Sequence, residues 1–123
     1  MRITFELMKE MNEICQQSHV QFLIVVIPTK EQVFSDCLEH NSKIPLSDVT
    51  HKLLVNERSA LAQTFKFMDD SNIPYVDPLP ALKTAAGLGL YAASAGDMHP
   101  GKNGFRVIGE ATAETLKQSD RKN

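Results

Sequence analysis

The feature that most constrains the fold is an unbroken apolar run, Phe22-Leu-Ile-Val-Val-Ile27, which ends abruptly at Pro28. A strand with one solvent-exposed face alternates polar and apolar residues, whereas this run contains no polar residue at all. Such a run is typical of a parallel β-strand that is covered on both faces. It is the longest apolar run in the chain and is too short to cross a bilayer, so no membrane span is predicted.

Helical patterns lie on both sides of this strand. Thr29 follows the strand as a predicted N-cap, and Gln32 completes a capping-box pattern three residues later. A polar loop over 39–49 separates this first helix from the rest of the chain. The predicted elements are helices over 3–18, 30–38, 52–70, 79–86 and 102–118, with a second, short strand over 73–77. In the last helix the residues expected to face inward are Phe105, Ile108, Thr112 and Leu116.

Alternation of helices with apolar strands predicts an α/β fold with right-handed crossovers. We expect part of a three-layer α/β/α flavodoxin-like sandwich with a short parallel sheet. The 123 residues show no break in composition, so residues 1–123 are interpreted as a single domain. Only two strands are convincing, and a two-stranded sheet is a poor independent fold. The pattern therefore predicts that further strands of the same sheet lie outside these residues.

Composition excludes some classes of function. The net charge is −2, and the 13 Lys and Arg residues are scattered, so no nucleic-acid partner is predicted. The first ten residues alternate charged and apolar side chains, unlike the unbroken apolar core of a signal peptide. Cys15 and Cys37 lack metal-site or redox spacing and are interpreted as small buried hydrophobic residues, with a disulfide as the alternative. The cellular compartment is therefore left open.

The segment with the clearest chemistry is Gly96-Asp97-Met98-His99-Pro100-Gly101, which directly precedes the last predicted helix. In acyl transfer, a neutral imidazole takes a proton from a hydroxyl nucleophile, and a carboxylate on its other nitrogen orients it. A short loop before a helix could hold both groups in that relation. An isolated Asp-x-His is also common by chance, and Asp before a helix is often only a cap.

Asp97-Met98-His99-Pro100, followed by Gly104-Phe105 and an amphipathic helix, resembles the final motif block of SGNH/GDSL hydrolases. The segments 25–34 and 75–79 resemble the strand and turn motifs of the branch of that family that includes alginate O-acetyltransferases. The resemblance extends from about Leu7 to the end of the chain. It implies an SGNH hydrolase-type sandwich and a serine esterase or O-acyltransferase activity. His99 would be the general base and Asp97 its orienting partner, acting on a small-molecule or carbohydrate ester without a cofactor. A bacterial parent protein, periplasmic or membrane-associated, is compatible with it.

The sequence also departs from this family. It contains no Gly-Asp-Ser block, since Gly96-Asp97 is followed by Met98, and it has no match to the glycine and asparagine blocks that stabilise the oxyanion. The chain alone is therefore expected to be inactive, with the serine upstream of Met1 in a longer parent. The alternatives are a degenerate, non-catalytic module for carbohydrate binding or assembly, and a small α/β regulatory domain.

Other polar residues carry weaker expectations. Lys30 follows the first strand and could contact a substrate, although a solvated first helical turn explains it more simply. The histidines show no metal-ligand spacing, so no metal site is predicted. If the chain is a fragment, apolar surfaces that the missing part would cover should be exposed, and self-association is then expected.

Overall fold

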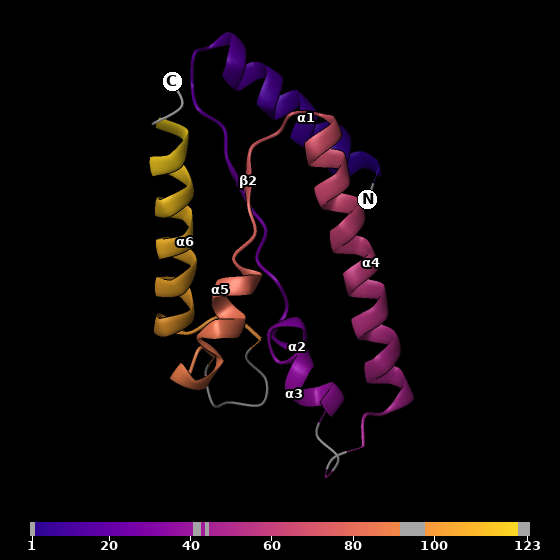
Figure 1. Cartoon of the computed structure of the whole chain (residues 1–123). Coiled ribbons are helices and arrows are strands. Elements are labelled where there is room, and N and C mark those ends of the chain that lie inside the picture. The colour runs from indigo at the N-terminus through magenta and orange to yellow at the C-terminus, as the bar shows by residue number, and fades with distance from the viewer. Residues whose placement is uncertain (1, 41–42, 44, 92–97, 121–123) are drawn as a thin grey trace.

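The computed structural model describes residues 2–40, 43, 45–91 and 98–120, and Figure 1 shows their arrangement. The chain is mainly helical. Its elements in chain order are α1 (Arg2–Gln17), β1 (Ile24–Val25), α2 (Lys30–Val33), α3 (Ser35–His40), α4 (Asp48–Asp70), β2 (Tyr75–Val76), α5 (Leu79–Thr84), the 3-10 helix η1 (Ala86–Leu88) and α6 (Lys102–Asp120). Within these residues no helix is both long and apolar enough to cross a membrane.

The sheet consists of β1 and β2, which pair in parallel with Ile24 opposite Tyr75 and Val25 opposite Val76. The ladder continues at both ends, where the Ile24 N–H donates to Pro74 O and the Val26 N–H to Val76 O, each at 3.0 Å. Parallel pairing with a helix between the strands agrees with the crossover expected from the sequence. The paired stretch is much shorter than the six-residue apolar run.

The expectation of a three-layer flavodoxin-like sandwich was wrong for this structure, which is a helical assembly around a two-stranded sheet. The physical reason lies in the pairing. An apolar run becomes a regular strand only where a neighbour satisfies its backbone groups. Here the partner segment is confined between Pro74 and Pro78, neither of which can donate a backbone hydrogen bond. In the part of the chain that the structure describes, no third strand extends the ladder.

Helices cover the strand pair on two opposite sides. Helix α6 lies on one side and α4 on the other (Figure 1). The main apolar cluster lies on the α6 side, where Val25 of β1 packs against buried residues. Its buried members are Val33, Leu82, Leu90, Val107 and Ile108. Of the residues expected to face inward on α6, Ile108 is buried, but Phe105 is 54% exposed.

Two helix–turn–strand units repeat the same local design. Helix α1 leads to β1 through His19, and α4 leads to β2 through Asn72; these are non-glycine residues with φ of 54° and 52°. Each turn contains the same type of backbone hydrogen bond. The Val20 N–H donates to Cys15 O at 2.9 Å in the first turn, and the Ile73 N–H donates to Met68 O at 2.8 Å in the second. This six-to-one bond ends each helix and reverses the chain into the strand.

The two units differ in how well their helices are packed. Helix α4 buries Leu54 and Met68 completely, whereas the apolar side chains Ile3, Leu7, Met11 and Ile14 of α1 are each more than half exposed. The body of the molecule touches α1 along another row, in which Phe5 stacks on Phe67 of α4 with ring centroids 4.4 Å apart. Only part of the apolar surface of α1 is therefore buried against the rest of the molecule.

Candidate functional site

The candidate site lies at the end of the molecule to which the carboxyl ends of both strands point. The chain leaves β1 toward α2 and β2 toward α5, and α6 begins at the same end (Figure 1). Catalytic loops of α/β proteins gather at this end because the strand termini leave room there. His99 therefore lies in a region where three connections converge. Asp97, its predicted partner, lies outside the described residues.

The backbone on either side of the site segment is held together at its base. Tyr91 and Pro100 form an antiparallel bridge, and the Gly101 N–H donates to Leu90 O at 2.7 Å. Pro100 is buried and His99, one residue earlier, is exposed. The imidazole is thus presented at the surface on a backbone that is anchored by its next two residues.

Gly104 explains how helix α6 can begin so close to this base. A Cβ built on Gly104 would lie 2.6 Å from Leu90 O and 2.7 Å from the Pro100 Cβ, much closer than real contacts. Only glycine therefore fits at this position without a shift of α6 or of the Leu90–Pro100 base. Asn103 adds a second tie, since its Nδ2 donates to Leu88 O at 2.7 Å.

Lys30 lies against the same base. Its Nζ is 5.7 Å from the centroid of the Tyr91 ring, which is within range of a cation–π interaction. Phe34 contacts the same ring edge-on at 5.8 Å. The structure therefore places Lys30 against Tyr91, which pairs with Pro100, and Pro100 directly follows His99 in the chain.

Tyr91 is the site residue that sequence reasoning missed. Its hydroxyl is buried and has no hydrogen-bond partner among the described residues. Burial, reinforced by the nearby Glu31 carboxylate, raises the pKa of the Tyr91 phenol above its ordinary value. The phenol therefore stays protonated at neutral pH and keeps an O–H donor available. No local pattern in the sequence marks this residue, because its contacts come from α2 and from beyond residue 98.

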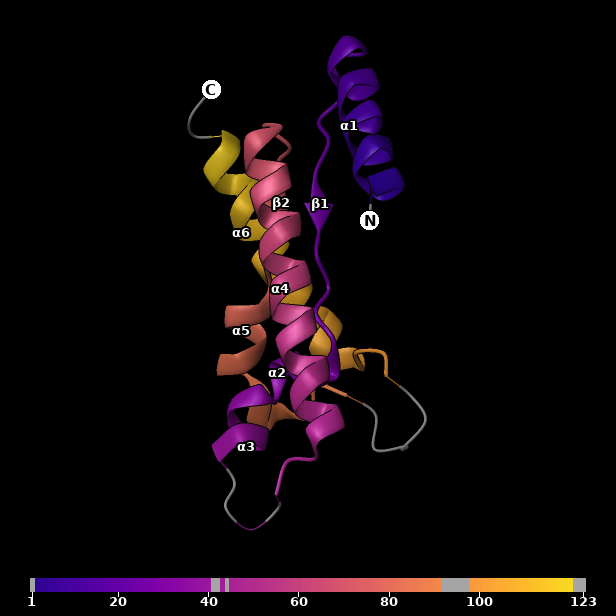
Figure 2. The same ribbon diagram turned by 90° about the vertical axis from the view of Figure 1, so that its right-hand side faces the viewer.

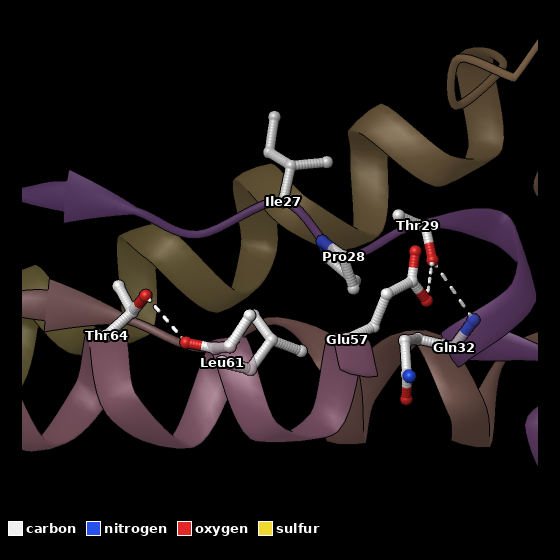
Figure 3. A pocket seen from close by; sticks show the side chains of 8 residues that line it. Ile27, Pro28, Thr29, Gln32, Glu57, Leu61 and Thr64 are labelled. Carbon is white, nitrogen blue, oxygen red and sulfur yellow. Dashed lines mark hydrogen bonds between the residues drawn. The ribbon is translucent and has the colours of Figure 1, made fainter. Parts of the chain in front are cut away.

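Apart from the His99 segment, a hollow of about 180 Å³ lies between the end of β1 and helix α4 (Figure 3). Its lining is mostly apolar, and its charged member is Glu57. The Thr29 Oγ1 donates to Glu57 Oε2 at 2.9 Å and accepts a hydrogen bond from the Gln32 N–H at 3.3 Å. The predicted N-cap at Thr29 is thereby confirmed. The lining residues are Ile27, Pro28, Thr29, Gln32, Glu57, Ala60, Leu61 and Thr64.

Gln32 does not complete the capping box that its spacing suggested. Its side-chain Nε2 instead donates to Leu54 O at 3.0 Å, and the residue is buried between α2 and α4. A long-range contact has replaced the local one because α4 packs over the first turn of α2. The same packing brings Glu57 to Thr29, a pairing 28 residues apart that no sequence spacing could indicate.

Among the described residues no group of three His, Cys, Asp or Glu side chains is placed to hold a metal ion. Comparison with known proteins gives no further guide to function, since no family model, no curated protein and no solved structure matches this chain.

Proposed function

We propose that this chain contributes the Asp-His part of a Ser-His-Asp site in an SGNH/GDSL-type serine esterase or O-acyltransferase. In this proposal His99 is the general base, Asp97 orients it, and the serine belongs to a polypeptide segment outside residues 1–123. The observation that supports it best is the exposed His99 beside a buried, bridged Pro100, at the end of the strands where such sites are built.

The reaction would follow the usual two steps of acyl transfer. His99 takes the proton from the serine hydroxyl as the serine oxygen bonds to the acyl carbon, and the protonated imidazole then gives that proton to the departing alkoxide. In the second step His99 deprotonates water, or a hydroxyl of a carbohydrate acceptor, as the oxygen of that molecule bonds to the acyl carbon. The bond between the acyl carbon and the serine oxygen then breaks, and the protonated imidazole returns its proton to the serine. The ester is thereby hydrolysed, or its acyl group is moved to the acceptor.

Lys30 is proposed to contact the substrate. Its ammonium group lies over Tyr91 at the base of the His99 segment, where it can attract the oxygen atoms of an ester or a carbohydrate. Alone, the chain is proposed to be inactive, because the nucleophile and the oxyanion donors would lie elsewhere. The exposed apolar row of α1 supports the further proposal that isolated residues 1–123 self-associate through contacts between these helix faces, without pairing of their β1 edges.

A serine-directed fluorophosphonate probe tests this proposal. Residues 1–123 alone should not be labelled, whereas the polypeptide extended upstream by about a hundred codons should be, the length needed for the missing strands and crossovers. His99→Ala in the extended protein should abolish labelling, and Asp97→Asn should reduce kcat by about 10⁴-fold. The matched control is His51→Ala, an exposed histidine on α4 that should leave labelling unchanged.

Two results would contradict the proposal. Labelling of residues 1–123 at one of their own serines would place the nucleophile inside the chain. Labelling and turnover that persist in His99→Ala would remove the general base and favour a non-catalytic role for this segment.

A further inference from the structure

The two helix–turn–strand units differ in what lies beside them. The connection from β1 to β2 runs through α2, α3 and α4, and α4, its longest helix, runs antiparallel to both strands (Figure 1). Helix α4 is therefore the crossover helix between two parallel strands. Helix α1 precedes β1 and enters it through the same type of turn, although it lies obliquely to the strand (Figure 1). Within the described residues, however, no strand stands on the other side of α1.

Among the described residues no strand pairs with the edge of β1 that faces away from β2. In a parallel ladder the N–H and C=O groups of one residue point to the same neighbour, and those of the next residue point to the opposite side. Ile24 and Val26 donate to the β2 segment, so the N–H and C=O of Val25 point to the other edge. By the same alternation Leu23 and Ile27 present their backbone groups there. These groups require a partner strand or water.

The space beside this edge has an apolar cover. Helix α1 stands beyond β1, on the side away from β2 (Figure 2). Between the helix and the strand lies an open hollow of about 420 Å³, and its lining contains no charged residue. The lining residues on the α1 side are Thr4, Leu7, Met8, Met11, Phe22, Leu23 and Ile24.

The position of α1 also indicates from where the missing strand would come. Consecutive right-handed crossovers that advance in one direction across a sheet place their helices on the same face. The Phe5–Phe67 stack shows that α1 lies beside α4. A strand that precedes α1 in the chain and pairs with the free edge of β1 would make α1 the same kind of crossover helix as α4.

We propose that the free edge of β1, together with the apolar row Leu7, Met8 and Met11 above it, is the docking surface for a parallel β-strand that precedes α1 in the polypeptide. The strand is apolar in its centre, because one side of its seat is lined only by uncharged residues. Pairing with Leu23, Val25 and Ile27 requires about five to seven residues, the ordinary length of a strand. The proposal does not involve Asp97 or His99.

A second copy of the chain fits this surface less well. Antiparallel pairing of two β1 edges requires a two-fold axis perpendicular to the sheet, which puts both α1 helices on the same face. Because α1 already stands over the space beyond its own edge (Figure 2), each copy would bring its α1 to the place where the other copy needs that space. A single strand fills the edge without this conflict.

Amide hydrogen exchange tests the proposal directly. Exchange is compared between residues 1–123 and the same protein extended by the roughly 30 codons that precede Met1, enough for a strand and its turn. The Val25 N–H should exchange at least about tenfold more slowly in the extended protein, because it gains a ladder bond. The Val26 N–H, which already donates to Val76 O, is the internal control and should change little.

Substitutions on α1 provide the matched controls. Leu7→Lys places a charge in the proposed docking surface and should return the Val25 exchange rate to that of residues 1–123. Leu7 is 52% exposed, so the change does not disrupt the existing core. Glu10→Lys, on an exposed position of the same helix, should keep the protection. His99→Ala should also keep it, so failure of the proposed chemistry and failure of the docking surface give different results.

Three results would overturn the proposal. The first is the absence of an open reading frame before Met1 that encodes an extended apolar segment. The second is unchanged Val25 exchange in the extended protein, or protection that Leu7→Lys does not remove. The third is protection of Val25 in residues 1–123 that grows with protein concentration, which would place a second copy on this edge.

Discussion

Helices α1 and α4 are both amphipathic, end in the same type of turn and lead into paired strands. The apolar residues of α4 are packed in the core, whereas most of those of α1 are exposed. Helix α4 has strands on its inner side and helix α2 near its start, and it buries Leu54 and Met68 completely. Helix α1 leaves Leu7, Met11 and Ile14 more than half exposed. The apolar pattern of a helix determines which of its faces is suited to burial, but the neighbouring elements decide whether that face is buried.

The largest expected effect compares two leucines in these helices. Leu54→Ala should lower the free energy of unfolding by about 2–5 kcal/mol, because it leaves a cavity at a fully buried position. Leu7→Ala should change it by less than about 0.5 kcal/mol, because the side chain is already largely in water. Urea denaturation followed by circular dichroism measures both. Equal losses for the two variants would show that α1 is packed as tightly as α4.

Helix α6 sharpens the comparison, since it contains a packed and an open glycine. Gly104→Ala should cost about 1–3 kcal/mol, because its Cβ would strike the Leu90 carbonyl and Pro100 unless the helix moves. Gly109→Ala has nothing within 4 Å of its Cβ and should stabilise the helix by about 0.5–1 kcal/mol. Thermal unfolding of the two variants checks this. A loss at Gly109 as large as that at Gly104 would contradict it.

The smallest expected effect concerns the two turns. Asn72→Ala should destabilise the protein by about 1 kcal/mol, because alanine is strained at a positive φ that asparagine tolerates. His19→Ala imposes similar strain at the end of α1, but global unfolding should hardly register it if α1 opens on its own. Instead, amide exchange within α1 should become faster. A global loss equal to that of Asn72→Ala would mean that α1 unfolds together with the rest of the molecule.

Sequence patterns were most reliable where the physical cause is local. The N-cap at Thr29 depends on a backbone N–H three residues later in the chain, and it was found as predicted. The helices also begin and end close to their predicted bounds, although the predicted helix 30–38 is divided into α2 and α3. The bond between Thr29 and Glu57, and the exposure of Phe105 on α6, were not predicted, because both depend on how distant helices pack.

By itself, the sequence determined the order of helices and strands and indicated a candidate Asp97–His99 pair before the last helix. Only the tertiary structure showed that the apolar run pairs along one edge, that Lys30 and Tyr91 lie at the base of the His99 segment, and that α1 overhangs an open strand edge. The reason is that capping and periodicity act over a few residues, whereas strand pairing and helix cover join residues far apart in the chain.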